Sequence, residues 1–112
     1  MAVPRLNVPL TLEAPVRESD GMGGFRIVWR NLGQLWAEMR SGAGSETRSE
    51  VGPQSRVGWR ITLRAAPIGD PRRPRPEQRL RMGSRLFRIS AVAESDARGR
   101  WLTCFAVEED QA

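Results

Sequence analysis

The sequence predicts a mainly β protein: a small, single-domain β-barrel of about six to seven short antiparallel strands. The first observation is strict alternation over residues 57–64, which gives a strand with one apolar and one arginine-lined face. Val57, Trp59, Ile61 and Leu63 form the apolar face, opposite Arg60, Thr62 and Arg64. Similar alternation recurs in further short segments separated by turn residues, a pattern typical of barrels and sandwiches. The length of 112 residues fits one domain over residues 1–112.

The first predicted strand runs from Leu6 to Glu13, and Pro9 confines it to the edge of a sheet. Residues 14–24 are rich in glycine and polar side chains, so they predict a long polar turn. A second strand should follow from Phe25 to Arg30.

Asn31-Leu32-Gly33 predicts a turn, after which residues 35–40 resume an extended segment. Its Leu, Ala, Glu and Met residues also favour helix, so a helical turn is an alternative here. If the segment is a strand, Trp36 lies opposite its more apolar face, either in the core or as an anchor for a partner.

Residues 41–56 predict a long mobile loop, since Val51 is their only sizeable apolar side chain. One helical turn around residues 46–51 is compatible with this composition. Loops of this length in compact domains are usually functional or disordered. The charged side chains that we assign to it are Glu46, Arg48, Glu50 and Arg56.

Residues 65–78 form a second distinctive segment, rich in proline and arginine. Prolines hold such a chain extended and arginines keep it hydrated, so we expect a projection from the barrel. Arg72, Arg73 and Arg75 are its candidate contacts, either with phosphates or with an acidic protein surface. The alternative is a solvated linker.

Further strands are predicted at residues 79–82, 86–93 and 100–107, followed by a frayed tail at 108–112. The last two strands are apolar on both faces, so either a short helix of this chain or a neighbouring subunit should cover the second face. Leu102 is therefore a candidate partner contact.

Catalysis is not expected, because the chain has no His, Lys or Tyr to act as general base, Schiff-base amine or phenolic acid. The single cysteine, Cys104, allows no intrachain disulfide and no cysteine-based metal site. We expect no metal and no cofactor.

The net charge of +5 rests on 18 arginines, which suit acidic proteins or nucleic acid. Neither a membrane span nor a signal peptide is predicted, so folding in the cytoplasm is expected.

The order of these segments resembles the phage head-tail joining family, especially its versions in gene transfer agents, from Arg5 to about Glu109. The resemblance is carried by colinear features and not by one motif. They are Arg5-Leu6-Asn7, Leu12-Glu13, Asp20-Gly21 with Gly23-Gly24, Trp29, Leu35-Trp36-Ala37-Glu38, the strand Arg60 to Arg64, and Phe87-Arg88-Ile89 with Ala91-Val92.

This resemblance implies a structural virion protein with a small β-barrel and no enzymatic activity. Such proteins form a homo-oligomeric ring, six-fold in the family, beneath the portal and its adaptor. They close the DNA-filled head and present the docking surface for the tail terminator or tail, with double-stranded DNA passing through the channel. A gating role for the loop at residues 41–56 is implied in the same way. The expected location is the neck of a virion or phage-like particle assembled in the bacterial cytoplasm.

The alternative function is a monomeric, OB-like protein that binds single-stranded nucleic acid through arginines and stacking aromatic rings. The chain has four Trp and three Phe, most of which alternate onto the expected core face, which leaves few for stacking. This alternative predicts tight oligonucleotide binding that weakens steeply with salt.

Overall fold

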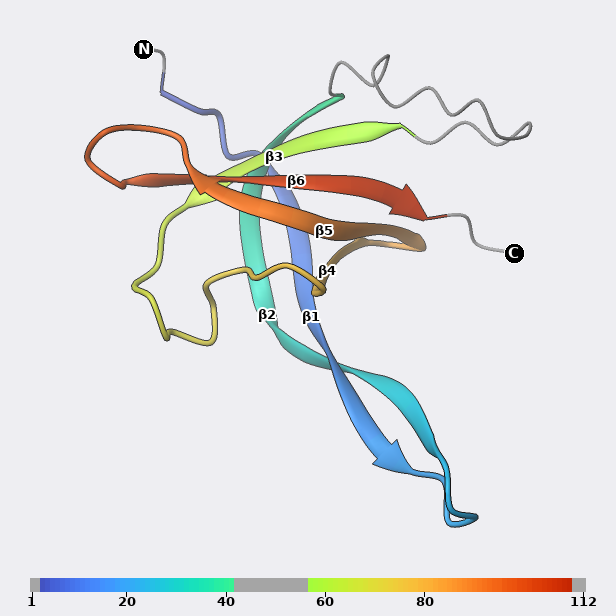
Figure 1. The fold of residues 1–112 in the computed structure, drawn as a ribbon. Coiled ribbons are helices and arrows are strands. Elements are labelled where there is room, and N and C mark those ends of the chain that lie inside the picture. Colours follow the sequence, from blue (N-terminus) through green and yellow to red (C-terminus); the bar gives the residue numbers. More distant parts are fainter. Residues whose placement is uncertain (1–2, 42–56, 110–112) are drawn as a thin grey trace, which may run out of the picture.

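The computed structural model of the chain describes residues 3–41 and 57–109, which form a single antiparallel sheet (Figure 1). Its strands are β1 (Val8–Ser19), β2 (Phe25–Ser41), β3 (Gly58–Arg64), β4 (Arg79–Met82), β5 (Arg85–Glu94) and β6 (Trp101–Glu109). The sheet closes in the order β1-β2-β3-β6-β5-β4, because β4 pairs back with β1. Within the described residues every regular element is a strand, so the predicted mainly β barrel is confirmed, and residues 35–40 are strand and not helix.

The barrel interior is filled by side chains from all six strands. The buried apolar cluster comprises Leu10, Leu12, Ala37, Ile61, Leu63, Leu80, Phe87, Ile89, Leu102, Cys104 and Ala106. Alternation within β3 is confirmed, since Ile61 and Leu63 are buried while Arg60 and Arg64 are exposed. The prediction is wrong for Val57, which lies before the strand and is exposed. Each fully buried leucine or phenylalanine contributes roughly 1.5–3 kcal/mol, so this cluster dominates the stability of the barrel.

Arginines of β3 partly cover the second face of β6. The guanidinium carbon of Arg64 lies 5.1 Å from the centre of the Trp101 ring, and that of Arg60 lies 5.9 Å from Phe105. Such contacts shield apolar rings while the charged head stays in water. Of the two predicted covers, a short helix of this chain is not found in the described residues, and arginines of β3 cover part of this face instead. Cover by a neighbouring subunit stays a prediction.

The hairpin of β1 and β2 differs most from the expectation. Pairing continues from Val8↔Ala37 to Ser19↔Phe25, so the predicted long turn shrinks to residues 20–24. The predicted turn at residues 31–33 is instead a β-bulge, because Leu12 pairs with Gly33 and Glu13 with Asn31, which leaves Leu32 as the extra residue. Gly33 has a φ of 123°, which explains why glycine occupies this position.

Beyond the bulge the hairpin leaves the barrel. β1 pairs with β4 only as far as Glu13, and β2 pairs with β3 only from Ala37 onward. Residues 14–30, here called the arm, are therefore held as a two-stranded ribbon that projects away from the other strands (Figure 1).

The C-terminal strand extends further than predicted. Glu108 and Glu109 belong to β6, and Glu108 accepts hydrogen bonds of 2.8 and 2.9 Å from Arg85. The predicted frayed tail therefore begins too early, and residues 110–112 lie outside the described residues. In the part of the chain that the structure describes, no helix is long and apolar enough to cross a membrane.

Candidate docking surface

The turn at the tip of the arm is held by one carboxylate. Asp20 Oδ1 accepts hydrogen bonds from the backbone N–H of Met22 at 2.7 Å and of Gly24 at 3.0 Å. Asp20 N also donates to the carbonyl of Gly24 at 3.1 Å. The backbone hydrogen bonds from Met22 and Gly24 lower the pKa of Asp20, so the tip is held by an ionised side chain at neutral pH.

The arm exposes three large apolar side chains. Met22 is 88% exposed, Phe25 62% and Ile27 52%. The Arg17 guanidinium lies 4.3 Å from the Phe25 ring centre, which covers that ring only in part. Apolar side chains gathered on a projecting ribbon are typical of a protein contact surface.

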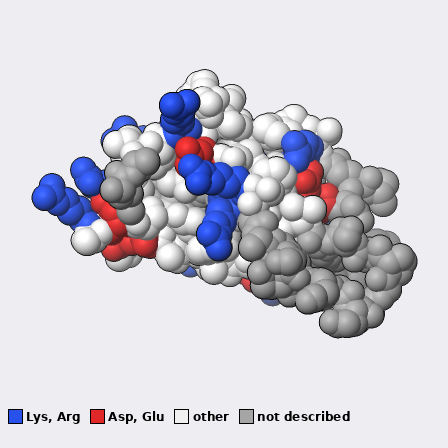
Figure 2. All heavy atoms as spheres, turned by 90° about the horizontal axis from the view of Figure 1, so that it is seen from above, with Lys and Arg blue, Asp and Glu red and all other residues white. Residues whose placement is uncertain are grey.

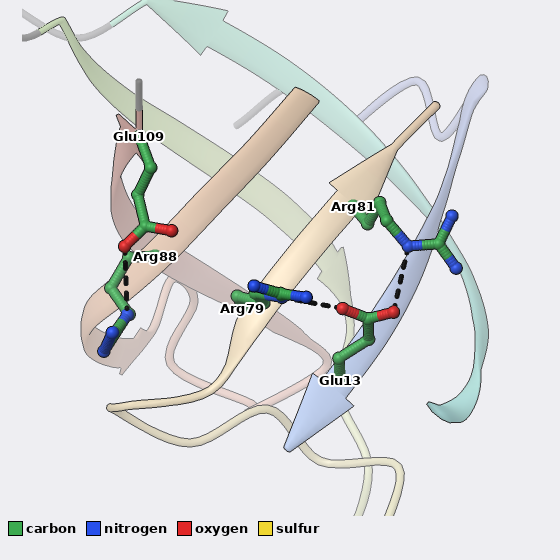
Figure 3. A network of polar contacts seen from close by, with 5 residues as sticks. All are labelled: Glu13, Arg79, Arg81, Arg88 and Glu109. Atoms are coloured by element: carbon green, nitrogen blue, oxygen red, sulfur yellow. Dashed lines mark hydrogen bonds and ion pairs between the residues drawn. The ribbon is translucent and has the colours of Figure 1, made fainter. Parts of the chain in front are cut away.

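Glu13 fixes the base of the arm, directly at the bulge. Its two carboxylate oxygens accept hydrogen bonds from Arg79 Nε at 2.7 Å and Arg81 Nε at 2.9 Å (Figure 3). Burial on its own would raise the pKa of Glu13, since only 6% of the residue is exposed. The hydrogen bonds and charges of the two arginines outweigh burial and lower the pKa. A buried ionised bridge therefore joins β1 to β4 where the arm leaves the barrel.

Trp29, on the β2 side of the arm, contacts arginines of β4 and β5. The guanidinium carbon of Arg79 lies 4.0 Å from the Trp29 ring centre, and that of Arg88 lies 5.4 Å away. Arg88 in turn forms an ion pair with Glu109 of 3.4 Å (Figure 3). Glu13 and Trp29 thus attach both strands of the arm to β4 and β5, which favours a fixed direction for the arm.

The proline- and arginine-rich segment packs against the barrel and does not simply project. Pro74 is fully buried and Gln78 is 8% exposed. Three turn hydrogen bonds fold the segment: Asp70 N to Pro67 O, Arg73 N to Asp70 O, and Gln78 N to Arg75 O. The prediction of an extended chain is corrected here because apolar burial of Pro74 and these turn bonds outweigh the solvation of the arginines.

A groove of about 630 Å³ lies between this segment and the base of the arm. One side comes from Ala14, Pro15 and Val16 of β1 with Arg30 and Leu32 of β2. The other side comes from residues 68–71 with Arg73, Arg75 and Gln78. Segments that are distant in the sequence thus form one concave surface.

The predicted contact residues are distributed unevenly around this surface. Arg73 and Arg75 line the groove, whereas Arg72 lies beside it and is 3.5 Å from Asp70. Trp36 is 52% exposed on β2. The prediction of Leu102 as a partner contact is wrong, because its side chain is fully buried in the core. The loop residues Glu46, Arg48, Glu50 and Arg56 lie outside the described residues.

The arm itself was not predicted as a contact surface. A signal was present, since Phe25, Ile27 and Trp29 alternate on one face of a strand next to a polar segment. The same alternation is typical of a core face, and pairing beyond the edge of the barrel is a tertiary feature that period-two patterning does not reveal.

Acidic side chains lie beside arginines on the face shown in Figure 2 and do not leave one continuous basic patch. Several arginines of the described residues form ion pairs, for example Arg85 with Glu108 at 2.8 Å and Arg100 with Asp96 at 3.0 Å. Burial raises the pKa of Cys104 to about 12, so its thiol stays protonated, as expected for a small core side chain. In residues 3–41 and 57–109 no group of three His, Cys, Asp or Glu side chains is placed to hold a metal ion.

Comparisons with known proteins agree with this architecture. A chain in the structure of a virion of a native gene transfer agent particle is 53% identical, with a TM-score of 0.82, over 98% of this chain and 100% of that one. The solution structure of protein SF1141 from Shigella flexneri 2a shares the fold, with a TM-score of 0.69 at 21% identity and full coverage of both chains. Among curated proteins no significant match is found.

The family model described as phage head completion protein matches residues 1–109. This match spans the whole barrel, the arm and the groove, and it confirms the resemblance drawn from the order of the segments. The chain belongs to the phage head completion protein family.

Proposed function

We propose that this protein is a head-tail connector subunit of a phage-like particle, which closes the DNA-filled head and presents a surface to which the tail attaches. The observation that carries the proposal is the family match over residues 1–109. The 53% identity to a chain of a gene transfer agent virion supports a place in such a particle. In this role the protein performs no chemistry and acts through its contacts.

Copies of the chain are proposed to associate head-to-tail in a ring, six-fold as the family resemblance implies, between the portal-adaptor and the tail. A ring requires two different surfaces on each subunit. The exposed apolar side chains of the arm supply one such surface, and Trp36 lies on the same strand as Phe25 and Ile27. Burying these side chains against a neighbouring subunit would remove their apolar surface from water, which favours association.

The nucleic-acid-binding alternative finds less support in the described residues. Phe87 and Trp101 are buried, and Trp59 packs edge-on against Phe87 with ring centres 5.7 Å apart. Phe25, Trp36 and Phe105 are exposed. Phe25 and Trp36 lie eleven positions apart on β2, Phe105 lies on β6, and the rings of Phe25 and Phe105 each have an arginine over them. A continuous stacking platform is therefore not formed by these rings.

The proposal is tested by complementation in cells whose own copy of the gene is deleted. The wild-type chain should restore tailed, DNA-filled particles, and the double variant Phe25→Ser/Ile27→Ser should leave heads without tails. Because both side chains lie outside the core, the double variant should fold, which a urea unfolding curve checks. Val3→Ser, an equally conservative change at a side chain that is 73% exposed, is the matched control and should restore particles. Full tailed particles without any functional copy of the chain would contradict the connector role.

A further inference from the structure

We propose that the groove at the base of the arm binds an extended, acidic polypeptide segment of a neighbouring connector protein. This inference rests on the proposed function, since it names the chemistry of a partner that a connector subunit would meet.

The groove carries an excess of positive charge. Arg30, Arg73 and Arg75 line it, against the single carboxylate of Asp70. Asp70 Oδ1 already accepts a hydrogen bond from Arg72 N at 2.8 Å and lies 3.5 Å from Arg72 Nε. Within the described part of the chain, none of the three lining arginines has an ion-pair partner, so their charges remain for an incoming anion.

The arginine side of the groove is formed in advance. Arg73 Nη1 donates to the carbonyl of Ala66 at 2.8 Å, and Arg75 N donates to Gln78 Oε1 at 2.9 Å. Buried Pro74 lies between these two residues and fixes the backbone against the barrel. A surface that is already ordered loses less conformational entropy when a partner binds.

The rest of the lining is apolar, which selects for polypeptide. Pro15, Val16 and Leu32 face the groove from the hairpin, and Ile68, which is 86% exposed, faces it from the other side. A chain with carboxylates and interspersed apolar side chains satisfies both the arginines and these residues. Double-stranded DNA offers phosphates on a convex surface and presents no apolar side chains to Pro15, Val16 and Leu32.

The size of the groove agrees with this occupant. Its volume of about 630 Å³ lies within the range of sites that enclose most of a small ligand. A short length of extended chain fits such a volume, whereas a folded acidic domain would contact only the rim.

The test measures binding of a short synthetic peptide of Glu, Leu and Ser to the full chain by fluorescence anisotropy. A second peptide with Gln in place of every Glu is the control ligand. The acidic peptide should bind, more weakly as salt rises, and the Gln peptide should not. Arg30→Gln/Arg75→Gln should weaken binding by at least about tenfold, because each lost charged contact is of that order. Both arginines are exposed, so this variant should fold.

Arg5→Gln/Arg98→Gln is the matched control, because both arginines are exposed and neither lines the groove, and it should change affinity by less than about twofold. Ile68→Ser tests the apolar part and should also weaken binding. Equal affinities of wild type, Arg30→Gln/Arg75→Gln and Arg5→Gln/Arg98→Gln would overturn the inference. So would tighter binding of a DNA duplex than of the peptide through the same arginines.

Failure of this inference is distinguishable from failure of the proposed function. If the wild-type chain restores particles but the arginine variant binds the peptide normally, the connector role stands and the groove assignment falls. If the wild-type chain restores no particles, the connector role itself is contradicted.

Discussion

The ionised bridge at Glu13 allows a quantitative prediction for Glu13→Gln, which keeps the shape of the side chain and removes its charge. The native carboxylate is 6% exposed and accepts hydrogen bonds of 2.7 and 2.9 Å from two arginines. Charge-assisted hydrogen bonds are worth roughly 1.5–3 kcal/mol, and Gln keeps one acceptor while turning an amide N–H₂ towards a guanidinium. We expect the free energy of unfolding at pH 7 to fall by roughly 2–3 kcal/mol. Urea titration followed by tryptophan fluorescence measures it.

The difference in unfolding free energy between wild type and Glu13→Gln should depend on pH, and this dependence tests whether the ionised carboxylate is its cause. The pKa of Glu13 is lower in the folded chain than its ordinary value of 4.5, so its stabilisation is complete above that value and is lost as pH falls through the folded pKa. A protonated Glu13 closely matches Gln, and the gap between wild type and Glu13→Gln should therefore shrink in acid. Glu18→Gln is the control, because Glu18 lies on the exposed arm 3.5 Å from Arg26, and it should cost less than about 1 kcal/mol. Equal losses for the two variants, or a Glu13→Gln loss that ignores pH, would refute the reasoning.

Further predictions concern the core and the bulge. Leu102→Ala should lower the free energy of unfolding by roughly 2–5 kcal/mol, because Leu102 is fully buried; a loss under about 1 kcal/mol in urea would contradict this burial. Cys104 should react with iodoacetamide at pH 8 only on unfolding, since burial raises its pKa to about 12, and rapid labelling of the native chain would count against its position. Gly33→Ala should lower the free energy of unfolding by roughly 1–3 kcal/mol, because the φ of Gly33 is 123°. Gly58→Ala is the control and should lower it far less, because Gly58 has open space around it and no such φ. Similar unfolding midpoints for the two variants would argue against the bulge.

The barrel could be predicted from the sequence because its strands bury one face. Ile61 and Leu63 alternate with Arg60 and Arg64, and a core accepts only one of these sets, so the period of two reports real burial. The arm could not be predicted in the same way. Its strands satisfy their backbone hydrogen bonds with each other outside the barrel, where neither face needs to be consistently apolar.

Only part of the candidate docking surface could be predicted from the sequence, for a related reason. Arg73 and Arg75 were identified from their unusual clustering with proline. Their partner in the groove, Arg30, belongs to β2 and is brought there by the register of the hairpin. That register depends on the bulge at Gly33, which the sequence signals only as a turn.

Localisation of the chain within assembled particles tests the connector role most directly. Cryo-electron microscopy of particles from the organism that encodes this chain, with the chain carrying a small tag, would place it. The account predicts a ring of tag density at the neck, between the portal and the tail. Tag density spread over the capsid shell, or absent from purified particles, would contradict it.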